Sequence, residues 1–113
     1  MSTHHHIDYI ELYAHDLDNI KTFYAKVFGW AFTDYGSNYI AFEASGLKGG
    51  FEKVADPIVN GALVVLYSED LEKSKDAVIQ AGGKIVKDIF SFPGGRRFQF
   101  LDPSGNELAI WSE

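Results

Sequence analysis

Apolar and polar residues alternate along the first structured stretch of the chain, Ile7–Ala14. One face of this segment carries Ile10, Leu12 and Ala14, and the other carries Tyr9, Glu11 and Tyr13. A period of two is typical of a β-strand whose faces meet different surroundings. We therefore expect the aliphatic face to pack on a core and the Tyr–Glu–Tyr face to line another surface.

The period then changes from two to between three and four, which predicts an amphipathic helix. Its apolar stripe is formed by Leu17, Ile20, Phe23, Tyr24, Val27 and Phe28. Asp16 is placed to cap the first turn with its carboxylate, and Gly29 to end the helix in a left-handed conformation. Three β-rich segments follow, at residues 30–35, 38–43 and 49–54.

The same order of elements recurs in the second half. A strand is predicted at 61–67, a helix at 71–81 capped by Asp70, and strands at 84–90, 96–101 and 107–111. A shift of 54 residues matches Tyr13 with Tyr67, Asp16 with Asp70, Lys21 with Lys75 and Gly29 with Gly83, and a shift of 58 matches Phe42 with Phe100. Unrelated strand–helix stretches would share caps and glycines, but the constant order and spacing favour a duplication. We expect one domain, 1–113, made of modules 7–56 and 57–113.

The composition narrows the function classes. The chain has 113 residues, a net charge of −6, 15% aromatic residues and no cysteine. The negative charge argues against a nucleic-acid partner and suits a neutral or cationic ligand. Without cysteine there are no disulfides, thiolate metal sites or thiol nucleophiles. No membrane span or signal peptide is predicted, so we expect no membrane partner and a cytoplasmic location.

Three local motifs, in this order, resemble the vicinal oxygen chelate superfamily, which includes glyoxalase I, bleomycin- and fosfomycin-resistance proteins and extradiol dioxygenases. They are HDLDNIKTFYAKVFGW (15–30), EDLEKSKDAVIQAGGKIV (69–86) and FQFLDPSGNELAIW (98–111). The resemblance implies an α+β fold in which two βαβββ modules form a curved, half-open eight-stranded barrel with helices on the outer side. It also implies a ligand in the concave face and a homodimer.

Metal-dependent members of this superfamily place His, Glu or Gln on the first and fourth strands of each module. Aligned by the motifs, these positions fall on Tyr9, Phe51, Leu63 and Ala109. Three of these side chains have no donor atom, and a neutral tyrosine is a poor ligand. A one-residue slip brings in Glu52 and Glu107, but it moves them to the other sheet face or leaves the remaining positions empty. We therefore expect no metal and no cofactor, and metal held by His4, His5 or His6 would be adventitious.

The ligand-binding positions predicted for the concave face are Tyr9, Glu11, Tyr13, Phe51, Leu63, Tyr67, Ala109 and Trp111. Glu11 is the candidate catalytic residue, because burial among aromatic rings disfavours its charged form and suits it to act as a base or bind a cation. The alternative is a structural pair with a cation such as Lys53. Arg96 and Arg97 are adjacent in a strand, so one is expected on each face, where it either clamps an acidic ligand group or is solvated.

Three functions remain open at this stage. The leading one is metal-free small-molecule binding, similar to the bleomycin-resistance branch, with a neutral or cationic ligand. The second is a glyoxalase-type lyase or isomerase that uses Glu11 with tyrosines or an atypical metal site. The third is a structural dimer with a filled barrel.

Overall fold

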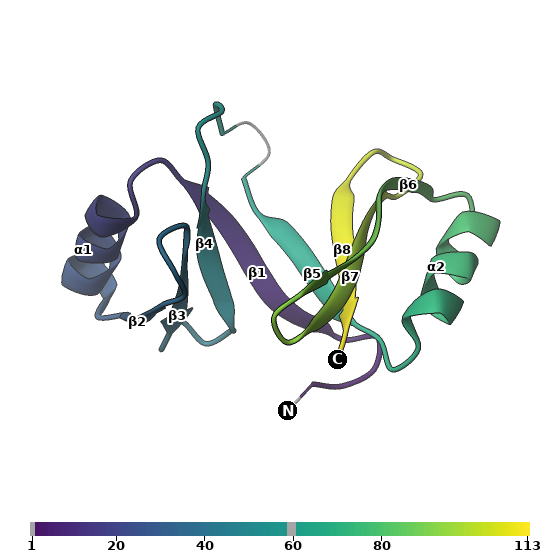
Figure 1. The fold of residues 1–113 in the computed structure, drawn as a ribbon, viewed down its shortest axis with the longest axis horizontal. Coiled ribbons are helices and arrows are strands. Elements are labelled where there is room, and N and C mark those ends of the chain that lie inside the picture. Colours follow the sequence, from purple (N-terminus) through teal and green to yellow (C-terminus); the bar gives the residue numbers. More distant parts are fainter. Residues whose placement is uncertain (1, 59–60) are drawn as a thin grey trace. The chain divides into compact units, whose positions relative to one another are not determined.

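The computed structural model describes residues 2–58 and 61–113. Met1 and residues 59–60, which belong to the predicted domain 1–113, lie outside the described residues. The chain forms two compact units: residues 9–63, and residues 64–113 together with the N-terminal segment up to Asp8. We call them the first and second modules (Figure 1), counting the whole strand that begins at Ile7 with the first and the whole strand that begins at Leu63 with the second.

The first module runs strand, helix and three strands. Its elements are β1 (Ile7–Ala14), α1 (Leu17–Phe28), β2 (Ala31–Asp34), β3 (Tyr39–Glu43) and β4 (Gly49–Lys53). The strands lie in the order β2-β3-β4-β1. β1 and β4 are parallel, while β4 pairs antiparallel with β3 and β3 with β2. The module is therefore a mixed four-stranded sheet with one helix, as Figure 1 shows in purple to teal.

The second module repeats this arrangement. Its elements are β5 (Leu63–Tyr67), α2 (Leu71–Gln80), β6 (Lys84–Phe92), β7 (Gly95–Leu101) and β8 (Glu107–Ser112). The strand order is β5-β8-β7-β6, with β5 parallel to β8 and the other two pairs antiparallel. The α+β class and the two βαβββ modules predicted from the sequence are thus confirmed. None of the helices in the described part of the chain is long and apolar enough to cross a membrane.

Both helices begin at the predicted aspartates. A side-chain oxygen of Asp16 accepts from the Asn19 amide at 3.1 Å, and one of Asp70 accepts from the Lys73 amide at the same distance. Gly29 ends α1 with a φ of 75°, as expected. In the second module the left-handed glycine is Gly82, with a φ of 98°, so the predicted match of Gly29 with Gly83 is wrong by one residue. The shorter helix explains this, since α2 has 10 residues and α1 has 12.

A repeated ion pair strengthens the case for a duplication. Lys21 Nζ lies 2.8 Å from an Asp34 carboxylate oxygen, and Lys75 Nζ lies 2.6 Å from one of Asp88. Both pairs link the helix of a module to the strand that follows it, and both members differ by 54 positions. Helix caps also recur in unrelated folds. A matched ion pair between helix and strand forms only where the helix packs in the same way against the strand that follows it, so it favours a duplication more strongly.

Each module has its own core on the helix-covered face of its sheet. The first core consists of Ala14, Leu17, Ile40, Phe42 and Phe51, against which Leu12, Ile20, Tyr24, Trp30 and Phe32 pack. The second consists of Leu71, Phe98 and Ile110, with Leu66, Val78, Ile85, Ile89 and Phe100 packed on it. Burial of these apolar groups is the main stabilising term. The opposite face of each sheet, which we call the open face, is not covered by the module's own helix.

Candidate functional site

The open face of the first module carries the Tyr–Glu–Tyr side of β1. Leu12 and Ala14 belong to the core beneath α1, so the alternating residues Tyr9, Glu11 and Tyr13 lie on the other face. The predicted orientation of this strand is therefore confirmed. Glu11 is only 3% exposed, whereas both tyrosines are half-buried. A carboxylate at this depth requires polar neighbours to offset its lost hydration.

A chain of hydroxyl groups supplies such neighbours. The Tyr39 hydroxyl donates to a carboxylate oxygen of Glu11 at 3.2 Å, and the Tyr9 and Tyr39 hydroxyls lie 2.5 Å apart. When Tyr39 donates to Glu11, Tyr9 is left to donate to Tyr39. Burial first, and then the bond with Tyr9 and the charge of Glu11, raise the pKa of Tyr39 well above its ordinary value. Tyr39 therefore stays protonated and acts as a donor at neutral pH.

Gly50 makes room for this network. In the parallel register of β1 and β4, Gly50 is opposite Glu11. A Cβ atom at Gly50 would lie 2.5 Å from the Tyr39 hydroxyl oxygen and 2.6 Å from that of Tyr9. The missing side chain thus lets both phenol groups lie over the strand beside Glu11.

The register of β4 corrects two predictions. Phe51 is opposite Leu12, belongs to the core and has its ring 5.3 Å from that of Tyr24 in α1. Its predicted place on the ligand side is therefore wrong. Glu52 is opposite Tyr13 and lies on the open face, where the sequence interpretation had excluded it. The first module thus presents two carboxylates, those of Glu11 and Glu52, on one face.

Lys53 is not placed as the suggested partner of Glu11. It is opposite Ala14, three positions along the register from the Glu11 pair. A structural pairing of Glu11 with a cation other than Lys53 stays a prediction, and the hydrogen bond described for Glu11 comes from Tyr39. The carboxylate of Glu11 therefore lies beside a phenol hydroxyl that donates to it.

In the second module, four further candidate positions share strands β5 and β8. Leu66 and Ile110 pack in the helix-side core, which puts Leu63 and Tyr67, and likewise Ala109 and Trp111, on the open face. Tyr67 is opposite Trp111, and their ring centroids are 5.1 Å apart. Glu107 alternates with Ala109 and so also lies on this face.

The residues present do not fit the metal site of metal-dependent superfamily members. Leu63 and Ala109 offer no donor atom, and Phe51 lies in the core. Within residues 2–58 and 61–113, no group of three or more His, Cys, Asp or Glu is arranged to hold a metal ion. His4 instead accepts a hydrogen bond from the Glu69 amide at 2.9 Å.

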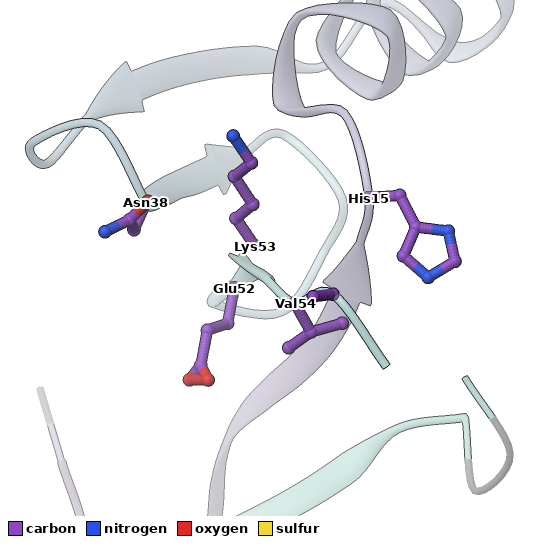
Figure 2. Close-up of a pocket in the computed structure, with 6 residues that line it drawn as sticks. His15, Asn38, Glu52, Lys53 and Val54 are labelled. Carbon is purple, nitrogen blue, oxygen red and sulfur yellow. The ribbon is translucent and has the colours of Figure 1, made fainter. Parts of the chain in front are cut away.

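A solvent-open depression of about 670 Å³ lies where β1 and β4 end. It is lined by His15, Asn38, Glu52, Lys53, Val54 and Ala55 (Figure 2). The His15 ring points away from Glu52 in this view, and its Nε2 lies 3.0 Å from the backbone oxygen of Asp56. His15 is thus exposed and tied to the backbone. Among the described open-face residues of β1, β3 and β4, Glu52 is the one that lines this depression.

The sequence interpretation missed three residues of the first module's open face: Tyr39, Gly50 and Glu52. Tyr39 had a usable signal, because Ile40 and Phe42 alternate with it along β3 and pack in the core. Gly50 had a weaker one, as a glycine inside a strand often marks a close approach of another group.

The comparisons with known proteins agree on the family. The sequence matches the model of the Glyoxalase/Bleomycin resistance protein/Dioxygenase superfamily over residues 6–110. It is 34% identical, over 97% of this chain and 95% of the relative, to a glyoxylase-like domain-containing protein of Didymella fabae.

Two solved structures have the same fold. A hypothetical protein from Bacillus halodurans C-125 matches with a TM-score of 0.78 at 12% identity, over 98% of this chain and 96% of the other. The Mn(II)-bound glyoxalase from Novosphingobium aromaticivorans matches with a TM-score of 0.71 at 23% identity, over 99% of this chain and 40% of the other. With a family match over nearly its whole length, the chain belongs to the glyoxalase/bleomycin resistance protein/dioxygenase superfamily.

Proposed function

We propose that the chain binds a small molecule on the open face of the first module, without using the metal site of its metal-dependent relatives. The ligand is neutral or cationic, and Glu11 is its main polar contact. One observation carries the proposal: a carboxylate that is 3% exposed lies on the tyrosine-rich face of the sheet, where a phenol hydroxyl donates to it. An ammonium or N–H group of a ligand can donate a charge-assisted hydrogen bond to such a carboxylate.

The surrounding residues support this choice of ligand. Glu52 adds a second negative charge on the same face. Tyr9, Tyr13 and Tyr39 add aromatic surface that stacks on flat groups and attracts cations. Ligand sites are mainly apolar with a few placed polar groups, and this face fits that description. The positions Leu63, Tyr67, Ala109 and Trp111 of the second module stay predicted ligand contacts, and the homodimer and the cytoplasmic location stay predictions.

The enzymatic alternative rests on the same hydrogen bonds. In a glyoxalase-type lyase or isomerase, Glu11 would take a proton from carbon and Tyr39, protonated at neutral pH, would donate a hydrogen bond to the developing oxyanion. The Tyr39–Glu11 distance of 3.2 Å suits a shared site for both groups. Binding alone is preferred because it requires only the charge of Glu11 and no second step.

The test compares three probes of one shape: benzylamine, benzyl alcohol and benzoate. A ligand at ten times its Kd stabilises the fold by about 1.4 kcal/mol, which is about 5 °C in melting temperature for a domain of this size. We expect benzylamine to raise the melting temperature most and the Glu11→Gln variant to lose at least tenfold in affinity by calorimetry. The control is Glu43→Gln, which removes the same charge from an exposed position of β3.

Two outcomes would contradict the proposal. In the first, the natural protein binds benzoate more tightly than benzylamine, and the Glu11→Gln variant binds benzoate more tightly still. The other is an equal loss in both variants. Turnover of a glyoxalase substrate by chelator-dialysed protein, abolished in Glu11→Gln and retained in Glu43→Gln, would establish the enzymatic alternative instead.

A further inference from the structure

We propose that the solvent-facing side of α1 is a contact surface for a second copy of this chain, with the two α1 helices packed antiparallel. Phe23 and Val27, with Ile20 at their edge, form this surface, which we call the α1 stripe. Figure 1 shows α1 at the outer edge of the first module. The proposal does not depend on the ligand proposed for Glu11.

The α1 stripe is apolar although it faces solvent. Phe23 and Val27 are four residues apart, so they lie on the same side of the helix. Their exposed fractions are 52% and 54%, whereas Leu17 and Tyr24 of the same helix pack in the core of the first module. The half-buried Ile20 is three positions before Phe23 and extends the stripe toward the core. Apolar residues at alternating spacings of three and four are the pattern by which helices pair with one another.

The second helix shows that the scaffold does not require these side chains. At the shift of 54 residues, Phe23 corresponds to Ala77 and Val27 to Ala81. Both alanines are exposed as well. Packing on the sheet thus leaves these positions facing solvent in both helices, and α1 has large apolar side chains where α2 has methyl groups. Exposed apolar side chains that gather on one surface are typical of a contact with another molecule.

The charges of α1 select an identical helix in antiparallel orientation. Asp18 lies in the first turn and Lys26 in the last, and both are exposed. Among the ion pairs of the described residues, none uses Asp18 or Lys26. An antiparallel copy of α1 would bring its Lys26 near Asp18 and its Asp18 near Lys26, and it would also set opposite ends of the two helix dipoles together. A parallel copy would bring like charges together at both ends.

The corresponding positions of α2 are used differently. Glu72, which corresponds to Asp18, pairs with Arg96 at 2.6 Å, and Gln80, which corresponds to Lys26, is neutral. The second helix therefore has neither the apolar side chains nor the two uncommitted charges. The combination in α1 favours a second copy over an unrelated partner, because one helix supplies the apolar surface and both members of each ion pair.

The contact is small for a protein interface. A helix of 12 residues is about 18 Å long, so two such helices bury less than the roughly 1,600 Å² of a standard stable interface. We therefore expect a weak dimer that dissociates on dilution.

The experiment measures the dissociation constant of the dimer by sedimentation equilibrium. We expect the natural protein to dimerise reversibly, and Phe23→Ser and Val27→Ser each to raise the dissociation constant at least about tenfold. The matched control is Ile79→Ser, which removes an apolar side chain of similar exposure, 48%, from α2. This variant should change the dissociation constant less than about twofold. Dispersed NMR spectra of each variant confirm that it is folded.

A charge reversal tests the antiparallel orientation. Lys26→Glu should raise the dissociation constant at least about threefold, because it brings carboxylates together at both ends of the helix pair. The double variant Asp18→Lys/Lys26→Glu restores opposite charges at both ends and should dimerise about as well as the natural protein.

Four results would overturn the proposal. The first is a protein that stays monomeric at its highest soluble concentration. The second is a dimer that Phe23→Ser and Val27→Ser leave unchanged, and the third is an equal effect of Ile79→Ser. The fourth is a double variant that dimerises no better than Lys26→Glu alone.

Discussion

Replacing Gly50 by alanine tests the phenol–carboxylate network directly. The added Cβ would lie 2.5 Å from the Tyr39 hydroxyl oxygen and 2.6 Å from both Tyr39 Cε1 and the Tyr9 hydroxyl oxygen. Carbon and oxygen atoms do not approach so closely, so both phenol groups must move away. Their movement breaks the Tyr9–Tyr39 bond and the Tyr39–Glu11 bond, leaving Glu11 buried without its phenol donor.

The cost follows from these two bonds. A neutral hydrogen bond contributes about 1 kcal/mol and one to a charged group about 1.5–3 kcal/mol, so their loss costs about 2.5–4 kcal/mol. Alanine also restricts the unfolded chain, which returns about 0.4–1 kcal/mol. We therefore expect Gly50→Ala to lower the free energy of unfolding by about 2–3 kcal/mol, or about 8–12 °C in melting temperature.

The assay is urea unfolding of Gly50→Ala in the natural background and in Tyr9→Phe/Tyr39→Phe. Without the hydroxyls the cost should fall by at least about 1 kcal/mol, since only the ring carbon still has to shift. Gly49→Ala is the control: its Cβ would meet the Phe42 ring and the Ile10 carbonyl on the other face, so its cost should be the same in both backgrounds. An unchanged stability of Gly50→Ala, or equal costs in the two backgrounds, would refute the proposed network.

Two further predictions concern the hydroxyl groups of Tyr39 and Ser68. The pKa of Tyr39 is raised in the folded state, so the protonated phenol contributes stability below its unfolded pKa of about 10, and this contribution is lost as the pH rises above that value. The free energy of unfolding should therefore fall less at alkaline pH in Tyr39→Phe than in the natural protein. An equal fall in both proteins would contradict this. Ser68 is fully buried, with its Oγ 2.7 Å from the Ser74 hydroxyl and 2.9 Å from the Asp70 carbonyl oxygen, so Ser68→Ala should cost about 1–3 kcal/mol in urea unfolding. Ser91→Ala, at an exposed position of β6, should stay within about 0.5 kcal/mol of the natural protein.

The helix-side elements could be predicted because each carries a strong local signal. Asp16 and Asp70 cap their helices through short side-chain bonds that depend only on neighbouring residues. The alternation in β1 extends over eight residues and has an aliphatic face that must be buried. Such signals are set within one element, so no tertiary information is required.

Which side chains of β4 lie on the helix side and which on the open face could not be predicted, also for a physical reason. Its sequence, GGFEK, begins with two glycines, so only three side chains carry a pattern. The face of each β4 residue was therefore assigned by aligning the chain with the family motifs. An error of one residue in such an alignment exchanges the two faces of a strand. This slip moved Phe51 to the ligand side and Glu52 away from it. The pairing of β4 with β1, which joins residues far apart in the sequence, corrects both.

The two modules are alike where they meet their helices and different where they do not. The caps and the ion pairs Lys21–Asp34 and Lys75–Asp88 recur at a shift of 54, because a helix packed on a sheet restricts the residues that fit beneath it. The opposite faces of the two sheets carry different residues, with Glu11 beside the Tyr39 phenol in one module and Arg97 over the Phe90 ring in the other. A family assignment made from the shared side therefore predicts the scaffold. The ligand chemistry has to be derived from the open faces, where only the strand registers show which side chains act together.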